Sequence, residues 1–144
     1  MKTKMTLLLV TLSLAIAAFG QTASQACNVR SAVGAYGYSC TGAYLGQPFA
    51  AYGSVYGDGR GQWHGYGKVS LNGTILPWTH NTRANDPATV NPDCTGSVTY
   101  EVTIAGQPAP DAHFDYVIVD NGGEVKGFPI DNGYAVTCQL IREK

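Results

Sequence analysis

Few residues of this chain have the chemistry for proton transfer, and His80 is the most informative of them. It follows a hairpin turn at Asn72-Gly73, a pair typical of a two-residue β-turn. The register set by that turn brings His80 opposite Gly65 on an inner face, next to Trp63 and Trp78. A neutral imidazole among aromatic rings can orient a polar ligand group or transfer a proton near neutral pH. The simpler interpretation is a structural role, in which His80 only hydrogen-bonds backbone or water at the rim of a β-barrel.

His113 and Asp115 are a second candidate pair, in a segment that alternates them with Phe114, Tyr116 and Ile118. Alternate residues of a strand point to opposite faces, so one of the two sets faces inward. The apolar set makes the better core, and we expect His113 and Asp115 to face outward. The opposite assignment would point both of them into the interior.

Other catalytic signatures are missing from the sequence. It contains no Gly-x-Ser-x-Gly motif, no phosphate-binding glycine loop followed by a helix, and no closely spaced cysteine pair of the kind that binds zinc. We predict no second inward-facing ionisable group beside His80, which argues against hydrolysis. The sequence therefore predicts no catalytic residue, no metal site and no cofactor.

A set of eight inward-facing side chains forms the candidate ligand-binding site. Its members are Tyr36, Tyr38, Trp63, Trp78, His80, Tyr100, Phe114 and Tyr116. Such a set can line a cavity, but it can also simply fill a small barrel, and core packing is the simpler interpretation. Gly65 and Gly67 favour a cavity, because each leaves volume unfilled unless a facing ring occupies it.

The elements that would position these side chains are short strands separated by turns. Eighteen glycines and nine tyrosines among 144 residues favour this arrangement over long helices. The fourth strand is expected to be interrupted at residues 83–87, and residues 106–111, which contain two prolines, are expected to form an exposed connection. The expected strands cover residues 32–44, 49–56, 62–71, 74–82 (resuming at 89–91), 97–104, 114–119, 124–130 and 134–141.

Eight strands in simple succession predict an all-β fold, an eight-stranded antiparallel up-and-down barrel, with a β-sandwich as the alternative. The pattern leaves open whether Phe49 and Val55 or Tyr52 and Tyr56 face inward on the second strand. The composition fits one domain with a single core.

The N-terminus predicts a signal peptide at residues 1–20. Lys2 and Lys4 precede an apolar stretch over residues 5–19, and Ala18 and Gly20 are the small residues expected before a cleavage site after Gly20. The apolar stretch is shorter than the roughly 20 residues that a spanning helix needs, and the residues before Cys27 do not match a lipoprotein signal. We therefore expect a secreted or periplasmic protein with an N-terminal extension (21–31) and a barrel domain (32–144).

The four cysteines test whether the barrel closes. If Cys40 lies opposite Cys138, the same register pairs Tyr36 with Arg142 and Tyr44 with Tyr134, so the first and last strands match along their whole overlap. Directly opposed residues lie ~4.5 to 5.5 Å apart, within disulfide range. This predicts a Cys40–Cys138 bridge and, by elimination, a Cys27–Cys94 bridge, both reasonable in an oxidising compartment.

Three stretches resemble a family of small, secreted, uncharacterised bacterial proteins whose members carry GTYG, NPDCTGT and HFDFVIVD motifs. They are residues 28–42 (NVRSAVGAYGYSCTG), 89–100 (TVNPDCTGSVTY) and 113–131 (HFDYVIVDNGGEVKGFPID). The resemblance implies that Cys27 pairs with Cys94, and that the shape is similar to calycin and allene oxide cyclase barrels. Those barrels include ligand carriers and cyclases, but a shared fold alone assigns no function.

The sequence departs from the lipocalin pattern at its first strand. Gly34-Ala35-Tyr36 stands where lipocalins have Gly-x-Trp, and Tyr36 beside Arg142 would imitate their aromatic and arginine pair at the closed end.

The low charge of the chain limits the classes of binding partner that we expect. A net charge of -1 and 13% charged residues give no basic surface for nucleic acid, and no membrane contact is expected after signal cleavage. We expect a barrel that binds a small apolar or aromatic ligand at one mouth. The alternatives are a cyclase- or isomerase-type enzyme, which is less favoured, and a structural or adhesive surface protein with outward-facing tyrosines.

Overall fold

The computed structural model describes residues 26–144. The predicted signal peptide, its cleavage site after Gly20 and the start of the N-terminal extension lie outside the described residues. The described part is all-β, with two short 3-10 helices. Its elements are η1 (Val29–Ala32), β1 (Gly34–Tyr44), β2 (Gln47–Gly57), β3 (Trp63–Leu71), β4 (Thr74–Thr82), β5 (Thr89–Val90), β6 (Thr95–Ile104), β7 (Gln107–Val119), η2 (Asp120–Gly122), β8 (Glu124–Pro129) and β9 (Tyr134–Arg142).

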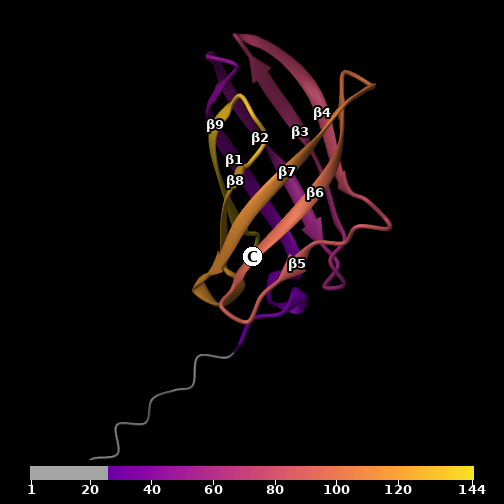
Figure 1. Cartoon of the computed structure of the whole chain (residues 1–144), viewed down its shortest axis with the longest axis vertical. Helices are drawn as coiled ribbons and strands as arrows, with labels where there is room; N and C mark the ends of the chain where they lie inside the picture. The colour runs from indigo at the N-terminus through magenta and orange to yellow at the C-terminus, as the bar shows by residue number, and fades with distance from the viewer. Residues whose placement is uncertain (1–25) are drawn as a thin grey trace, which may run out of the picture.

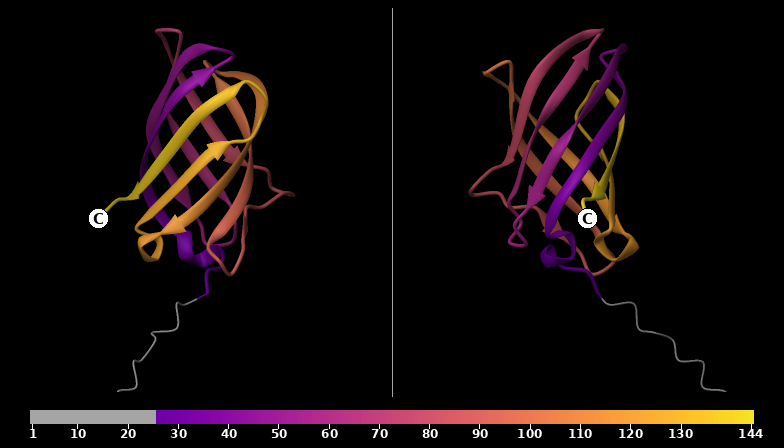
Figure 2. Two further views of the ribbon diagram at one scale, coloured as in Figure 1. Left: turned by 60° about the vertical axis from the view of Figure 1, so that its left-hand side comes forward. Right: turned by 180° about the vertical axis from the view of Figure 1, so that it is seen from behind.

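Eight of the strands close into an antiparallel barrel (Figure 1). Each of these eight strands pairs with the next one along the chain, so that β4 pairs with β6. The first strand, β1, pairs with the last, β9. The two-residue β5 pairs with the N-terminal end of β6, after the irregular residues expected to interrupt the fourth strand. Both views in Figure 2 show the strands wrapped around one common axis. The predicted eight-stranded up-and-down barrel is confirmed.

The Asn72-Gly73 hairpin has the predicted register. Both turn residues adopt positive φ, 47° and 83°, as a two-residue loop of this kind requires. As a result Gly67 lies opposite Trp78 and Gly65 lies opposite His80. This pairing places the bulky side chains of β4 against positions of β3 that have no side chain.

Both predicted disulfides are present. Cys40 and Cys138 are directly opposed on β1 and β9 and are bonded. Cys27 and Cys94 are bonded as well, which ties the segment before η1 to the turn before β6. Two structural disulfides indicate an oxidising compartment.

The inward and outward faces follow the same registers. On β7, Tyr116 and Ile118 are buried whereas His113 and Asp115 are exposed, as predicted. The sequence pattern left open which face of β2 points inward. Val55 is buried and Tyr52 is 61% exposed, so the face that carries Val55 points inward. The barrel core is therefore built from the apolar face of each strand.

One predicted connection is wrong. Residues 107–111, expected to be an exposed link, form the start of β7. Pro108 and Pro110 are tolerated there because this part of β7 pairs with β6 alone; pairing with β8 begins only at Phe114. A register shift between Tyr100 and Val102 accommodates the added length.

The end of the barrel near η1 and η2 is closed by Tyr36 and Arg142. The Tyr36 hydroxyl donates to the Gly122 carbonyl oxygen at 2.8 Å and accepts from Arg142 Nη2 at 2.8 Å. The guanidinium carbon also lies 5.4 Å from the centre of the Tyr36 ring. The expected aromatic and arginine pair is therefore formed.

Candidate ligand-binding site

Two adjoining spaces, which share lining residues, lie within the barrel. The first, the inner cavity, has a volume of about 60 Å³ and is surrounded by the mid-barrel side chains. The second, the mouth pocket, has a volume of about 340 Å³ and lies at the end opposite Tyr36, where the β1–β2, β3–β4, β6–β7 and β8–β9 turns meet. The two spaces share Cys40, Trp78, Val102, Ala112, Phe114 and Cys138 as lining residues.

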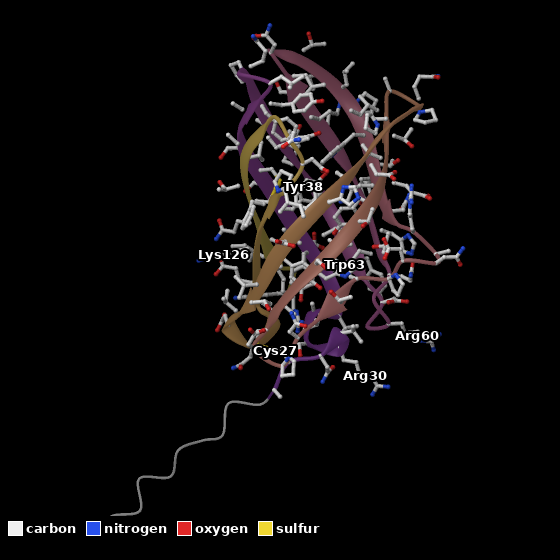
Figure 3. All side chains as sticks on the ribbon, viewed as in Figure 1. Cys27, Arg30, Tyr38, Arg60, Trp63 and Lys126 are labelled. Atoms are coloured by element: carbon white, nitrogen blue, oxygen red, sulfur yellow. A yellow bond between two sulfur atoms is a disulfide. The ribbon has the colours of Figure 1, made fainter. Side chains whose placement is uncertain are left out.

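Most of the predicted set lines the inner cavity. It is lined by Tyr38, Trp63, Trp78, His80, Tyr100, Phe114 and Tyr116, together with aliphatic residues. Figure 3 shows Tyr38 and Trp63 pointing into the barrel and Lys126 pointing away from it. Tyr36 lines neither space, since it is fully buried at the closed end against Trp63, with the two ring centres 5.9 Å apart.

The inner cavity is too small for an aromatic ligand. Its volume corresponds to about two water molecules at roughly 30 Å³ each. Ligand pockets usually measure about 300 to 1,000 Å³. The mid-barrel rings therefore act mainly as a packed core, and of the two spaces inside the described barrel the mouth pocket is the one with the volume of a ligand site.

Glycines in β2 and β3 make room for that core. A Cβ atom on Gly67 would lie 2.5 Å from the Tyr38 hydroxyl, and one on Gly53 would lie 2.7 Å from it. The Tyr38 hydroxyl accepts a hydrogen bond from Trp78 Nε1 at 2.6 Å, and burial raises the pKa of Tyr38 to about 12. Tyr38 and Trp78 are thus held as a neutral, rigid pair beneath the mouth pocket.

His80 is enclosed by three aromatic rings. The centres of the Tyr38, Trp78 and Tyr100 rings lie 5.2, 5.0 and 5.1 Å from the centre of its imidazole. Burial lowers the pKa of His80 to about 4, so the ring is neutral at pH 7.

The hydrogen-bonding state of His80 limits its chemistry. Nδ1 has no hydrogen-bond partner within the described residues. No Asp, Glu, Lys or Arg of residues 26–144 lines the inner cavity. His80 therefore has no charged partner with which to act as an acid–base couple, although its ring can still exchange a hydrogen bond with a small polar group.

The wall of the mouth pocket contains aromatic residues outside the set of eight predicted from the sequence. Tyr44 and Tyr134 are directly opposed on β1 and β9, with their ring centres 4.4 Å apart, and Phe49 approaches Tyr134 edge-on at 6.2 Å. Leu71 and Ile104 complete the apolar wall. The register used for Cys40 and Cys138 already predicted the Tyr44–Tyr134 pair, so the signal for this wall was present in the sequence.

The rim of the mouth pocket carries negative charge. Among the residues that the structure describes, Asp111 and Asp131 are the only charged ones in the pocket lining. Asp131 Oδ2 accepts from the His113 backbone N–H at 2.8 Å, and its Oδ1 lies 2.7 Å from His113 Nδ1. Asp111 pairs with Arg83. His113 therefore contacts Asp131, while the other member of the predicted pair, Asp115, lines a separate groove on the outer surface.

These features define the chain as a closed, disulfide-bonded β-barrel with a small apolar pocket at one mouth. Comparison with protein-family models, with curated proteins and with solved structures finds no match. The resemblance to a secreted barrel family therefore stays a prediction.

Two further searches cover only the part of the chain that the structure describes. Within residues 26–144 there is no group of three or more histidine, cysteine or acidic residues arranged to hold a metal ion. No helix in that range is both long and apolar enough to cross a membrane.

Proposed function

We propose that the protein is an exported barrel that binds a small apolar or aromatic molecule in its mouth pocket. The mouth pocket itself carries this proposal. Its volume of about 340 Å³ lies at the lower end of the range typical of ligand sites, and aromatic and aliphatic side chains dominate its lining. A ligand of one or two rings fits this space.

The floor of the pocket supports the same proposal because it is already organised. Trp78 on β4 is held by its hydrogen bond to Tyr38, and the Cys40–Cys138 disulfide joins β1 and β9, two other strands of the pocket wall. A wall that is rigid before binding loses little conformational entropy when the ligand arrives. Even a small pocket of this kind can therefore bind with useful affinity.

Export is the second part of the proposal. The two disulfides are consistent with a periplasmic or extracellular location, and the N-terminal sequence has the pattern of a signal peptide. The ligand is therefore a molecule present outside the cytoplasm.

Titration of the mature, oxidised chain (residues 21–144) with 2-phenylethanol tests the proposal through tryptophan fluorescence. Trp78 lines the mouth pocket, so saturable quenching is expected. Tyr134→Ala should weaken binding about tenfold, because it removes one wall of the pocket. Tyr66→Ala, on the outer face and 67% exposed, is the control and should have no effect. Absence of saturable binding, or equal binding by the Tyr134 variant, would overturn the proposal.

A surface-binding or adhesive role is the second candidate. Tyr52, Tyr56 and Tyr66 are all more than half exposed on the outer face of β2 and β3. Tyr66 is paired with Ser54, which lies between the two β2 tyrosines on the same face. Exposed tyrosines of this kind are enriched at protein interfaces. Strictly monomeric elution at high concentration would count against self-assembly through this face.

An enzyme of the cyclase or isomerase kind is the weaker alternative. Its one supporting observation is the unpartnered Nδ1 of the buried His80. Turnover that is unchanged in His80→Ala would remove the residue on which this alternative depends.

A further inference from the structure

We infer that the ligand of the mouth pocket is a cation, namely a small apolar or aromatic molecule that carries an ammonium group. This inference rests on the proposed function and specifies its ligand class. It depends on two properties of the same pocket, the sign of the charge at its rim and the aromatic rings of its wall.

The charged side chains at the rim of the mouth pocket are both acidic. Asp111 and Asp131 line the pocket, and no lysine or arginine in the described part of the chain does. Carboxylates at the edge of an apolar space attract a cation and repel a ligand carboxylate, and the interaction is stronger than in bulk water because the wall has a low dielectric constant. A fatty or aromatic acid is therefore a poor match for this pocket.

The two carboxylates differ in how far they are neutralised. Arg83 pairs directly with Asp111 and offsets much of its charge, although the same guanidinium also lies 3.7 Å from Glu101. Among residues 26–144 the Asp131 carboxylate is hydrogen-bonded only to His113, and that pair is negative whenever the imidazole is neutral. We therefore assign the attraction mainly to Asp131.

The aromatic wall provides the second half of the recognition. Tyr44 and Tyr134 pack together with Phe49 beside them. The faces of such rings carry negative electrostatic potential and attract ammonium groups, and a combination of rings with a nearby carboxylate is a recurrent way to bind them. Burial, Tyr44 and Asp131, in that order, raise the pKa of Tyr134, so the Asp131 carboxylate acts on this wall.

Three ligands that share a phenylethyl body test the inference by calorimetry on the mature, oxidised protein. They are 2-phenylethylamine, 2-phenylethanol and 3-phenylpropionate, which differ in the charge of one end. At pH 7.5 and about 0.02 M salt the amine should bind about fivefold or more tighter than the alcohol, and the acid should bind weakest. Raising the salt to about 0.5 M should shrink the preference for the amine without weakening the alcohol.

Two substitutions test whether the Asp131 carboxylate is the group that attracts the ammonium group. Asp131→Asn should bring the amine and the alcohol to equal affinity, whereas the matched control Asp115→Asn, on the outer face, should leave the preference intact. If Asp131→Asn disturbs the turn, the salt dependence of the wild type remains an independent test.

The outcomes separate the two proposals. An alcohol that binds as tightly as the amine, or a preference insensitive to salt, overturns the cation inference and leaves ligand binding intact. If none of the three compounds binds, both proposals fail.

Discussion

Cys40 and Cys138 lie directly opposite one another on the first and last strands of the barrel, with their Cα atoms 4.1 Å apart. Their disulfide crosses the junction between the two ends of the sheet. The same two residues line both the inner cavity and the mouth pocket. The same covalent contact therefore reinforces the β1–β9 ladder that closes the barrel and forms part of the wall of the proposed site.

Removal of this bridge should weaken both stability and ligand binding. The double variant Cys40→Ala/Cys138→Ala is expected to lose about 2 to 5 kcal/mol of unfolding free energy in urea titrations. It should also bind the ligand less tightly, because the β1–β9 ladder in the pocket wall is no longer cross-linked. The matched variant Cys27→Ala/Cys94→Ala should lose stability without a change in affinity, since neither residue lines the mouth pocket. Equal affinity in both variants would show that the junction does not shape the site.

Gly65 should be intolerant of any side chain. A Cβ atom there would lie 2.0 Å from His80 Nε2, so Gly65→Ala should cost about 1 to 3 kcal/mol of unfolding free energy through overpacking. Gly37→Ala is the control, because the nearest atom to its Cβ would be 4.0 Å away at a side-chain oxygen. Combining Gly65→Ala with His80→Ala should cost less than the sum of the two single changes. Strict additivity in this double-mutant cycle would contradict the packing of His80 over Gly65.

Stability should fall in mild acid because of His80. Its pKa is about 4 in the folded protein and about 6.5 in the unfolded chain, so the unfolded state binds the proton first as the pH drops. The contribution of the neutral ring is complete above about pH 6.5 and is lost progressively down to about pH 4, by roughly 3 kcal/mol. Urea titrations at pH 7 and pH 4.5 measure this loss.

Two variants isolate the His80 contribution from that of other titrating groups. His80→Phe should show a smaller drop between the two pH values, whereas the exposed His64→Phe should behave like the wild type. A drop of the same size in the His80 and His64 variants would rule out His80 as the cause.

The parts of the structure that the sequence predicts are those set by short-range turn chemistry and by pairing register. Asn72-Gly73 requires positive φ and therefore fixes which residues of β3 and β4 face each other. The match of Cys40 with Cys138 aligns the apolar faces of the first and last strands along their full overlap. Closure, both disulfides and the inward orientation of the core aromatic residues follow from these two constraints.

Other features of the structure depend on distances in space that a pattern of residue types along the sequence does not contain. The start of β7 was missed because Pro108 and Pro110 usually interrupt strands, and only the absence of β8 from that stretch makes them acceptable. The volume left between the mid-barrel rings depends on how Tyr38 and His80 fill the space above the glycines. The contact between His113 and Asp131 joins β7 to the β8–β9 turn and has no signal in local sequence.

The ligand-binding residues predicted from the sequence overlap only partly with the lining of the mouth pocket. The sequence pointed to one mouth of the barrel but selected mid-barrel rings, of which only Trp78 and Phe114 line the mouth pocket. The remaining wall comes from strand ends beside four turns, where Tyr44, Phe49 and Tyr134 are half-buried. Strand ends near turns have weak alternation, so their side chains are the hardest to assign from a pattern.

The most direct test of ligand binding in the mouth pocket is a titration of the ¹⁵N-labelled, oxidised protein with 2-phenylethylamine, followed by two-dimensional amide NMR. We predict saturable shifts confined to the turn end of the barrel, including Tyr44, Leu71, Ile104 and Tyr134, with no change at the closed end around Tyr36. Shifts that centre on the outer face of β2 and β3 would contradict this, and so would an unchanged spectrum at millimolar ligand.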